Sequence, residues 1–269
     1  MAPAPTIGLI AGGGELPLLF ARQAKKRGFS LRTAAIRGSA SPSLEKFSDA
    51  ITWVSIGQLG ALTGFFNKQG VKRAVMHGKV QHSQLFRHFR LDWKALKLWA
   101  RLKDRSGEAL LKAVAGELRR SGVNLMDGRH FMEEAIIPKG WLTKTRAQGP
   151  ARESLAYGLR QARRLAQAGI GQTILVKGNA VAAVEAMEGT DEAIRRAGRW
   201  AGPGILMVKV ASPRQDWRFD IPTLGPRTLQ SLIRAKAAGV VVEGGRSFLL
   251  SRAKTVQLAE KSGIFILAV

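Results

Sequence analysis

Residues 6–17 decide the fold of the first half of the chain, and they read Thr6-Ile-Gly-Leu-Ile-Ala11-Gly12-Gly13-Gly14-Glu-Leu-Pro17. The apolar run from Thr6 to Ala11 is typical of a buried strand, and helical spacing from Leu16 to Arg27 follows it. A second strand is expected from Phe29 to Ile36. A strand, a glycine turn, a helix and a second strand form a βαβ unit, so the sequence predicts a Rossmann-like parallel sheet.

The glycine run lies where the first strand turns into a helix. Glycines at such a turn let backbone N–H groups approach a phosphate, and the helix N-terminus favours its negative charge. The pattern is not G-x-G-x-x-G, because Pro17 stands in place of the third glycine, and Arg37 stands where an NAD site would have an acid. We therefore expect Gly12, Gly13 and Gly14 to cradle a nucleotide or phosphate rather than a dinucleotide.

Further βα alternation extends the predicted sheet. Strands are expected from Ala50 to Ser55 and from Val71 to His77, with a helix from Gln58 to Gln69 between them. The sequence His77-Gly78-Lys79 then falls at the carboxyl end of a strand, where open α/β sheets bind ligands. We expect Gly78 to permit close approach and Lys79 to offer a cation to a phosphate, with His77 beside them. A lone histidine is more often structural, so His77 is given no acid/base role.

The composition limits the classes of protein that the chain can belong to. Its 269 residues, of which 45% are hydrophobic, suit two ordinary domains. Cysteine is absent, which excludes disulfides and a cysteine nucleophile and fits a reducing compartment. The start lacks a signal-peptide pattern, and no apolar run approaches about 18 residues, so a cytoplasmic location is expected.

The net charge of +24 predicts an anionic partner. Lysine and arginine are scattered over both halves, and aromatic residues make up only 7% without the interleaving of a base-stacking platform. We therefore expect no nucleic-acid partner. An anionic membrane surface, such as the inner leaflet to which a protein binds peripherally, explains the charge at least as well.

The segment from Ser83 to Arg120 is expected to be helical, basic and amphipathic. Large apolar residues alternate there with cations such as Arg87, Arg90, Lys94 and Lys97. One interpretation is a helix packed on the sheet with a solvated cationic face. The other is a surface that takes acyl chains or rests on a membrane.

A second domain is expected after the weakly periodic stretch from Phe131 to Gln148, which contains Pro138 and Gly140. We assign 1–132 to an N-terminal Rossmann-like domain and 150–269 to a smaller C-terminal α/β catalytic domain, with the ligand cleft between them. Helices are expected at Arg152–Gln167, Asp191–Arg199, Arg227–Ala238 and Ala253–Lys261, and strands at Thr173–Lys177, Ala180–Glu185, Gly204–Val210, Gly239–Glu243, Ser247–Leu250 and Ile264–Val269. The first two of these strands are expected to form a hairpin about Gly178-Asn179.

Acidic residues are concentrated in the second domain. Six of the chain's 19 acids lie between positions 185 and 220, where even spacing would put about two or three. They fall in Glu185-Ala-Met-Glu188-Gly-Thr190-Asp191-Glu192 and in Gln215-Asp216-Trp-Arg-Phe-Asp220-Ile-Pro-Thr223-Leu-Gly-Pro226. Carboxylates beside turn residues in a cationic chain are typical of a site where a divalent cation meets phosphate oxygens. For the first segment, a simple helix cap by Thr190 or Asp191 is an equally good interpretation.

Read with the glycine run, His77-Gly78-Lys79-Val80 and Asp104-Arg105-Ser106-Gly107, these two segments resemble the UDP-2,3-diacylglucosamine pyrophosphatase family of lipid A biosynthesis. The resemblance covers nearly the whole chain in the family's motif order. It implies hydrolysis of UDP-2,3-diacylglucosamine to UMP and 2,3-diacylglucosamine 1-phosphate with Mg²⁺ as cofactor. The chain has only four histidines, which argues against the two-metal site of calcineurin-like phosphoesterases.

Site residues are assigned within this resemblance. Asp220 is the principal catalytic residue and metal ligand, because a carboxylate must place metal or water for attack on a pyrophosphate. Asp191 and Glu188 are the next metal ligands, and Asp191 and Thr223 join the catalytic set. The substrate-binding set is completed by Asp104, Arg105, Gln172, Thr190 and Lys209. We also expect a homodimer.

The alternative from another class is a non-catalytic protein that binds anionic lipid or nucleic acid on the same scaffold. Such a protein would need the cations but not the carboxylates at Asp220 and its neighbours.

Overall fold

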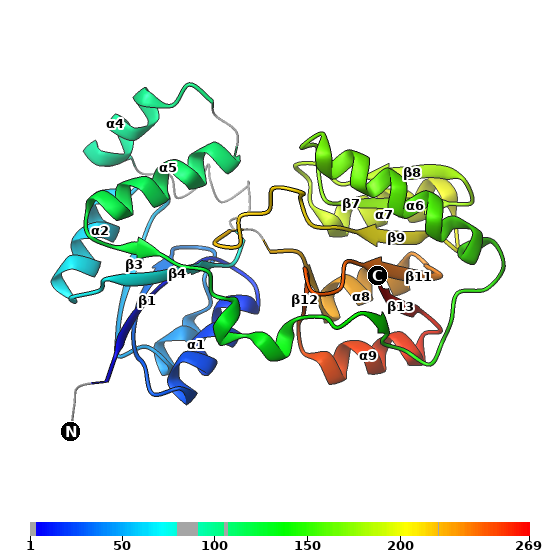
Figure 1. Ribbon diagram of the computed structural model, residues 1–269, viewed down its shortest axis with the longest axis horizontal. Coiled ribbons are helices and arrows are strands. Elements are labelled where there is room, and N and C mark those ends of the chain that lie inside the picture. The colour runs from blue at the N-terminus through cyan, green and yellow to red at the C-terminus, as the bar shows by residue number, and fades with distance from the viewer. Residues whose placement is uncertain (1–3, 80–90, 105–106, 220) are drawn as a thin grey trace. The chain divides into compact units, whose positions relative to one another are not determined.

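The computed structural model describes residues 4–79, 91–104, 107–219 and 221–269 (Figure 1). The chain divides into two compact units. The first unit comprises Met1–Glu133 together with Asp216–Asp220, and the second comprises Glu134–Gln215 and Ile221–Val269. The chain therefore leaves the second unit for five residues and then returns to it.

The first unit is built on a parallel sheet, as the βα alternation predicted. Its elements are β1 (Thr6–Ala11), α1 (Leu16–Lys26), β2 (Ser30–Ile36), the 3₁₀ helix η1 (Pro42–Lys46), β3 (Ala50–Val54), α2 (Leu59–Lys68), β4 (Arg73–His77), α4 (Trp93–Arg101), α5 (Gly107–Arg120), β5 (Asn124–Leu125) and η2 (Arg129–Phe131). The strand order is β3-β2-β1-β4-β5, and every pairing is parallel. The order reverses between β1 and β4, and such a switch point is where open α/β sheets bind ligands.

Helices cover both faces of this sheet (Figure 1). Side chains of α2, α4 and α5, among them Phe66, Ala95 and Leu118, form one core against the strands. On α1, Phe20, Ala21 and Ala24 are buried at helical spacing, and α1 packs against β1, β2 and β4. The expected helicity of Ser83–Arg120 is confirmed at α4 and α5, while its residues 83–90 lie outside the described ranges.

The second unit holds a mixed sheet of six strands. Its elements are η3 (Glu133–Ala135) at the boundary, β6 (Gly140–Trp141), α6 (Gly149–Gln167), β7 (Thr173–Lys177), β8 (Ala180–Val184), α7 (Thr190–Ala201), β9 (Leu206–Lys209), β10 (Thr223–Leu224), α8 (Pro226–Arg234), β11 (Gly239–Val242), β12 (Phe248–Leu249), α9 (Arg252–Lys261) and β13 (Phe265–Ala268). The order is β6-β13-β11-β9-β7-β8, with β9, β11 and β13 parallel and the expected β7–β8 hairpin antiparallel. A separate parallel pair joins β10 to β12.

Two cores lie on opposite faces of the six-stranded sheet. Helix α6 packs on β7 and β9 over Ile174, Val176 and Val208. Helices α7, α8 and α9 cover the other face, where Ile194 and Leu229 are fully buried. None of the helices described is both long enough and apolar enough to cross a membrane.

The expected domain bounds of 1–132 and 150–269 differ from the structure at two places. Residues 134–149, expected as the connection between the domains, belong to the second unit, where β6 pairs with β13. Asp216–Asp220 belongs to the first unit, because Phe219 is buried in the core formed with α2, α4 and α5. The apolar surface that Phe219 buries in the first unit stabilises the segment there, although the residues on both sides of the segment in the sequence belong to the second unit. The ligand cleft expected between the two domains stays a prediction.

Candidate active site

The first candidate region is the loop crossing at the switch point of the first unit. The N–H group of Gly12 donates to the carbonyl of His77 over 2.8 Å, and the N–H group of Gly13 donates to the carbonyl of Lys79 over 2.8 Å. Lys79 N–H returns a bond of 3.0 Å to the carbonyl of Gly13. The expectation that the N–H groups of Gly12 and Gly13 face a phosphate is therefore corrected, because the backbone of the neighbouring loop accepts both.

Gly78 allows the two loops to touch. Its φ is +96°, and a Cβ atom there would lie 2.7 Å from the backbone carbon of Gly12 and 2.7 Å from the oxygen of Gly13. Gly14 differs, since it has a φ of +98° but no atom within 4 Å of the position that a Cβ would take. At the switch point of the first unit, Gly14 and the side chain of Lys79 are exposed.

The His77 ring is buried, with only 4% of the residue exposed, and it contacts Phe20 edge to face. Burial lowers the pKa of His77 to about 3, against the opposing charge of Asp127. Its Nε2 has no hydrogen-bond partner among the described residues, and a Cβ added at Gly128 would overlap that atom. The ring is neutral and enclosed by Phe20 and Gly128, and the substrate contact expected of His77 stays a prediction.

The second candidate region lies at the strand ends of the second unit. Strand β9 ends at Lys209, next to Glu185 after β8 and Thr173 at the start of antiparallel β7. Lys209 Nζ lies 2.7 Å from Thr173 Oγ1, 3.2 Å from Thr190 Oγ1 and 3.3 Å from Glu185 Oε2. We call Thr173, Glu185, Thr190 and Lys209 the lysine network.

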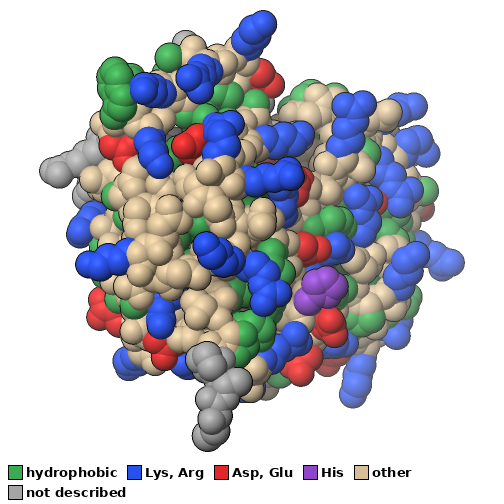
Figure 2. All heavy atoms as spheres, turned by 60° about the vertical axis from the view of Figure 1, so that its left-hand side comes forward, with side chains coloured by type: hydrophobic (Ala, Val, Ile, Leu, Met, Phe, Trp, Pro, Cys, Tyr) green, Lys and Arg blue, Asp and Glu red, His purple; other side chains and the backbone are tan. Residues whose placement is uncertain are grey.

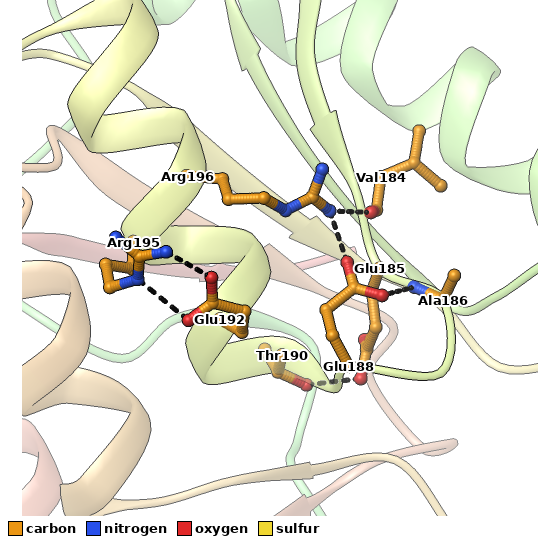
Figure 3. A network of polar contacts seen from close by, with 8 residues as sticks. All are labelled: Val184, Glu185, Ala186, Glu188, Thr190, Glu192, Arg195 and Arg196. Atoms are coloured by element: carbon orange, nitrogen blue, oxygen red, sulfur yellow. Dashed lines mark hydrogen bonds and ion pairs between the residues drawn. The ribbon is translucent and has the colours of Figure 1, made fainter.

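The two charged residues of the lysine network are buried, and the hydrogen-bond donors of Lys209 and Thr190 are matched to acceptors. Lys209 is 4% exposed and Glu185 is 8% exposed. Thr190 Oγ1 donates to Glu185 Oε1 over 2.7 Å, which leaves its lone pairs to accept from the ammonium (Figure 3). A buried charge pair of this kind persists only when further hydrogen bonds satisfy both partners, and the two threonines supply them.

Helix α7 shows that simple capping does not explain Thr190 and Asp191. The N-cap is Gly189, which has no side chain with which to cap. Thr190 is the first helical residue and turns its hydroxyl to Glu185, while Asp191 accepts from Arg227 Nε at 2.7 Å and from Ser231 Oγ at 3.1 Å. The capping interpretation is therefore wrong for both residues.

The remaining acids of this segment pair with arginines. Glu188 binds Arg196 through one oxygen and accepts the Ala186 N–H at 3.1 Å through the other (Figure 3). Glu192 pairs with Arg195 one turn along α7. Across the described ranges, no three acidic or histidine side chains gather where they could hold a metal ion. Asp191 and Glu188, the two predicted metal ligands that the structure describes, each accept from one arginine and one further donor, and metal binding by either stays a prediction.

The segment that carries the predicted principal residue is anchored within the first unit. The Arg129 guanidinium lies 3.8 Å from the centre of the Trp217 ring, and Asp127 Oδ2 holds Arg129 Nη2 at 2.6 Å. Hydrogen bonds from Arg218 lower the pKa of Asp216 below its usual value. Asp220 itself lies outside the described residues, as does Arg105.

The other predicted residues lie apart from one another along the chain. Gln172 precedes β7 and accepts the Val210 N–H at 2.9 Å through its carbonyl, which places it beside the lysine network. Thr223 begins β10 and is half-buried. Asp104 follows α4 in the first unit and is exposed.

One residue of this edge was not predicted. Glu243, directly after β11, is 8% exposed and accepts the Ala211 N–H at 3.0 Å. Arg163 and Arg246 lie 3.4 and 3.6 Å from its oxygens. The sequence feature that could have identified Glu243 is an acid at the carboxyl end of the apolar run Val240–Val242.

Two family models match the chain one after the other. The LpxI N-terminal domain matches residues 6–135, and the LpxI C-terminal domain matches residues 138–267. A curated relative, the UDP-2,3-diacylglucosamine pyrophosphatase LpxI of Caulobacter vibrioides, is 32% identical over 277 residues, which cover 98% of this chain and 97% of the relative. The resemblance seen in the motifs is thereby confirmed.

Similarity to solved structures is distant. The ADP complex of N5-carboxyaminoimidazole ribonucleotide synthetase is 16% identical with a TM-score of 0.28, covering 73% of this chain and 45% of that one. A biotin carboxylase from Campylobacter jejuni is 16% identical with a TM-score of 0.25, covering 72% of this chain and 42% of that one. The chain spans less than half of either structure, and scores this low carry no functional argument.

Proposed function

Since the chain belongs to the LpxI family, we propose that it hydrolyses the pyrophosphate bond of UDP-2,3-diacylglucosamine, giving UMP and 2,3-diacylglucosamine 1-phosphate in lipid A synthesis. One observation carries the proposal: both family domains match in order, and the curated pyrophosphatase aligns along 98% of the chain. The fold, a two-unit α/β protein with polar groups at its strand ends, is compatible with this reaction.

The lysine network supports the proposal chemically. A pyrophosphate diester carries two negative charges, so attack by water requires cations near the reacting phosphorus. Lys209 is held by Thr173 and Thr190 in one orientation, which removes the cost of ordering its flexible stem when the substrate binds. We propose that Lys209 and Thr190 make the phosphate contacts of the second unit. Because their N–H and O–H groups are directed at Thr173, Glu185 and each other in the structure, these contacts require hydrogen bonds to be exchanged when the substrate binds. Gly14 and Lys79 contact an anionic part of the same substrate in the first unit.

Magnesium dependence is part of the proposal. Mg²⁺ takes hard oxygen ligands, commonly one or two carboxylates together with substrate phosphates and water. Asp191 offers carboxylate oxygens of this kind. Its side chain is 34% exposed, and in the structure it accepts from Arg227 and Ser231, which a metal ion would have to displace in part. We propose Asp220, Asp191 and Glu188 as the candidate protein ligands. When bound, the ion would neutralise phosphate charge and lower the pKa of a water molecule.

Three further parts of the proposal concern the setting. We propose that the protein acts in the cytoplasm, that it associates peripherally with an anionic leaflet and that it forms a homodimer. Each has its own measurement: cell fractionation, vesicle binding and sedimentation velocity. If the protein is a monomer at the concentration of the activity assay, the proposed dimer is wrong, and the proposed reaction is unaffected.

The decisive experiment compares Asp220→Ala and Asp220→Asn with wild type in ¹⁸O-water, with and without Mg²⁺. We expect turnover to fall by about 10² to 10⁴ or more in both variants, because the barrier depends on a carboxylate that places water or metal. Substrate binding should persist, since the acyl chains and the phosphate cations supply it.

A matched control is Glu192→Gln, which removes an acid that pairs with Arg195 on the surface of α7. This variant should keep near-normal turnover. Near-normal turnover in either Asp220 variant would sink the assignment. A complete lack of hydrolysis by wild type, together with tight lipid or nucleic-acid binding, would favour the non-catalytic alternative.

A further inference from the structure

Helix α4 stands on the first unit with one side fixed and the other exposed. Asp92 caps it by accepting the Ala95 N–H at 2.9 Å through one oxygen, and its other oxygen accepts the Gly60 N–H of α2 at 2.5 Å. Ala95 enters the core of the unit, and Leu98 packs against that core. One carboxylate thus joins the starts of two helices, so α4 is held in a defined orientation.

The outward side of α4 is unusually apolar for a surface. Trp93 is 68% exposed and Leu96 is 44% exposed, one helical turn apart, and Leu91 just before the helix is 42% exposed. Single exposed apolar residues are ordinary, but a tryptophan and two leucines exposed within residues 91–96 together present an apolar patch. Such a patch costs solubility unless it has a partner.

Cations surround this patch. Lys97 Nζ lies 5.0 Å from the centre of the Trp93 ring, and Arg101 is exposed on the same helix. Lys94 is also exposed, and its ammonium donates to Thr63 Oγ1 of α2 at 3.2 Å. Lysine and arginine side chains are also spread widely over the face in Figure 2, in a chain of net charge +24. We call Leu91, Trp93, Lys94, Leu96, Lys97 and Arg101 the α4 face.

We propose that the α4 face docks the first unit onto an anionic lipid bilayer, with α4 lying in the plane of the interface. A short amphipathic helix with a tryptophan and flanking lysines has the chemistry of a membrane-surface segment, and tryptophan prefers the headgroup level. Charge complementarity selects the partner, because anionic headgroups attract the cations that flank the apolar patch. The inference rests on the proposed function in one respect, since a substrate with two acyl chains resides in a bilayer.

A nucleic acid fits the same face less well. Stacking of a base needs an open aromatic ring, whereas Lys97 lies over one face of Trp93. Exposed leucines would also contact phosphates and sugars without gain. The bilayer accounts for both the apolar residues and the cations.

The test is co-sedimentation of the full-length chain with vesicles of phosphatidylcholine containing about a third phosphatidylglycerol, with phosphatidylcholine vesicles as reference. Trp93→Ala/Leu96→Ala should weaken binding at least about tenfold. Lys94→Gln/Lys97→Gln/Arg101→Gln should weaken it by about fivefold for each charge removed. Binding should be lost at about 0.5 M salt, where charges are screened beyond a few ångströms.

Matched controls come from the second unit. Trp200 is 77% exposed with Arg199 5.3 Å from its ring centre, so Trp200→Ala removes a similar exposed pair elsewhere. Arg252→Gln/Lys254→Gln/Lys261→Gln removes three exposed cations of α9. Both controls should bind vesicles within about threefold of wild type, a loss smaller than that of a single headgroup contact.

Equal losses in the α4 and control variants would overturn the proposal, as would binding that survives high salt. Preferential binding of an oligonucleotide, with vesicle binding unaffected by the α4 substitutions, would favour the other class of partner. Hydrolysis measured in detergent micelles separates the two proposals. A chain that binds vesicles but does not hydrolyse the substrate would contradict the proposed reaction alone. One that hydrolyses in micelles but does not bind vesicles would contradict the docking and the peripheral association, and would leave the proposed reaction standing.

Discussion

The two units carry polar residues at the same kind of place, the carboxyl ends of parallel strands, but they build those places differently. In the first unit the loops after β1 and β4 touch backbone to backbone, with Gly12 and Gly78 in close contact. In the second unit three side chains meet around the ammonium of Lys209. The first edge depends on the absence of side chains and the second on their charges.

The two edges show that strands in an equivalent topology can end in sites of different chemistry. A glycine contact carries no charge and needs no compensation, but it tolerates no added atom. A buried ion pair has a large desolvation penalty, which its attraction and its extra hydrogen bonds must offset. We therefore expect the first edge to fail by steric clash and the second by loss of charge balance.

The largest effect is expected at the second edge. Lys209→Met should lower the free energy of unfolding by about 3 to 5 kcal/mol, because Glu185 remains buried beside an apolar side chain. Urea denaturation followed by circular dichroism measures the change. The double variant Lys209→Met/Glu185→Leu should recover a large part of it, since it removes both charges. A single variant as stable as wild type would show that the network is not balanced by charge.

A smaller effect is expected at the first edge. Gly78→Ala should lower the free energy of unfolding by about 2 to 4 kcal/mol. The loss has two causes, because the backbone at Gly78 is left-handed and the new Cβ atom would clash with the loop of Gly12. Gly14→Ala has a similar φ but open space around the new atom, so it should cost only about 1 to 2 kcal/mol. The difference between the two losses in the free energy of unfolding measures the contribution of the contact between the loops. Equal losses would mean that backbone strain explains everything.

The neutral histidine of the first edge should make stability depend on pH. The pKa of His77 is lowered from 6.5 to about 3, so the unfolded chain binds a proton in this range that the folded chain refuses. The free energy of unfolding should therefore fall as pH drops from 6.5 toward 3, by at most about 1.4 kcal/mol per pH unit. Because Asp216, Asp49 and Glu192 also have lowered pKa values, the range above about pH 5.5 isolates the histidine.

The pH effect has a matched pair of variants. His77→Asn should flatten the slope whatever it does to absolute stability. His130→Asn should leave the slope as it is, because the His130 side chain is 76% exposed. A slope that survives His77→Asn would assign the pH dependence to other groups.

The smallest effect is expected within the lysine network. Thr190→Val should cost about 1 to 2 kcal/mol, because Glu185 loses a donor and Lys209 loses an acceptor. Thr190→Ser keeps the hydroxyl and should cost less. Thermal unfolding with both variants gives the comparison, and identical melting temperatures would show that the hydroxyl contributes nothing.

Local sequence patterns were sufficient for the elements. Strand β1 and the helices α1 and α2 lie within a residue or two of their expected bounds, since apolar periodicity reflects which side of each element is buried. The assignment of Lys209 and Thr190 as site residues came from the family resemblance and stays a prediction. The local patterns did not reveal Glu243, or that His77 is enclosed by Phe20 and Gly128, because enclosure depends on residues far along the chain.

By itself the sequence determined the α/β class, the family and the βα order of the first unit, because these depend on local periodicity and on motifs read in order. Only the tertiary structure decided which carboxylates meet which cations. Lys209 and Glu185 are 24 residues apart, and the strand order β9-β7-β8 brings them together. It also decided that Asp216–Asp220 joins the first unit, because the burial of Phe219 there is a long-range effect that no local pattern encodes.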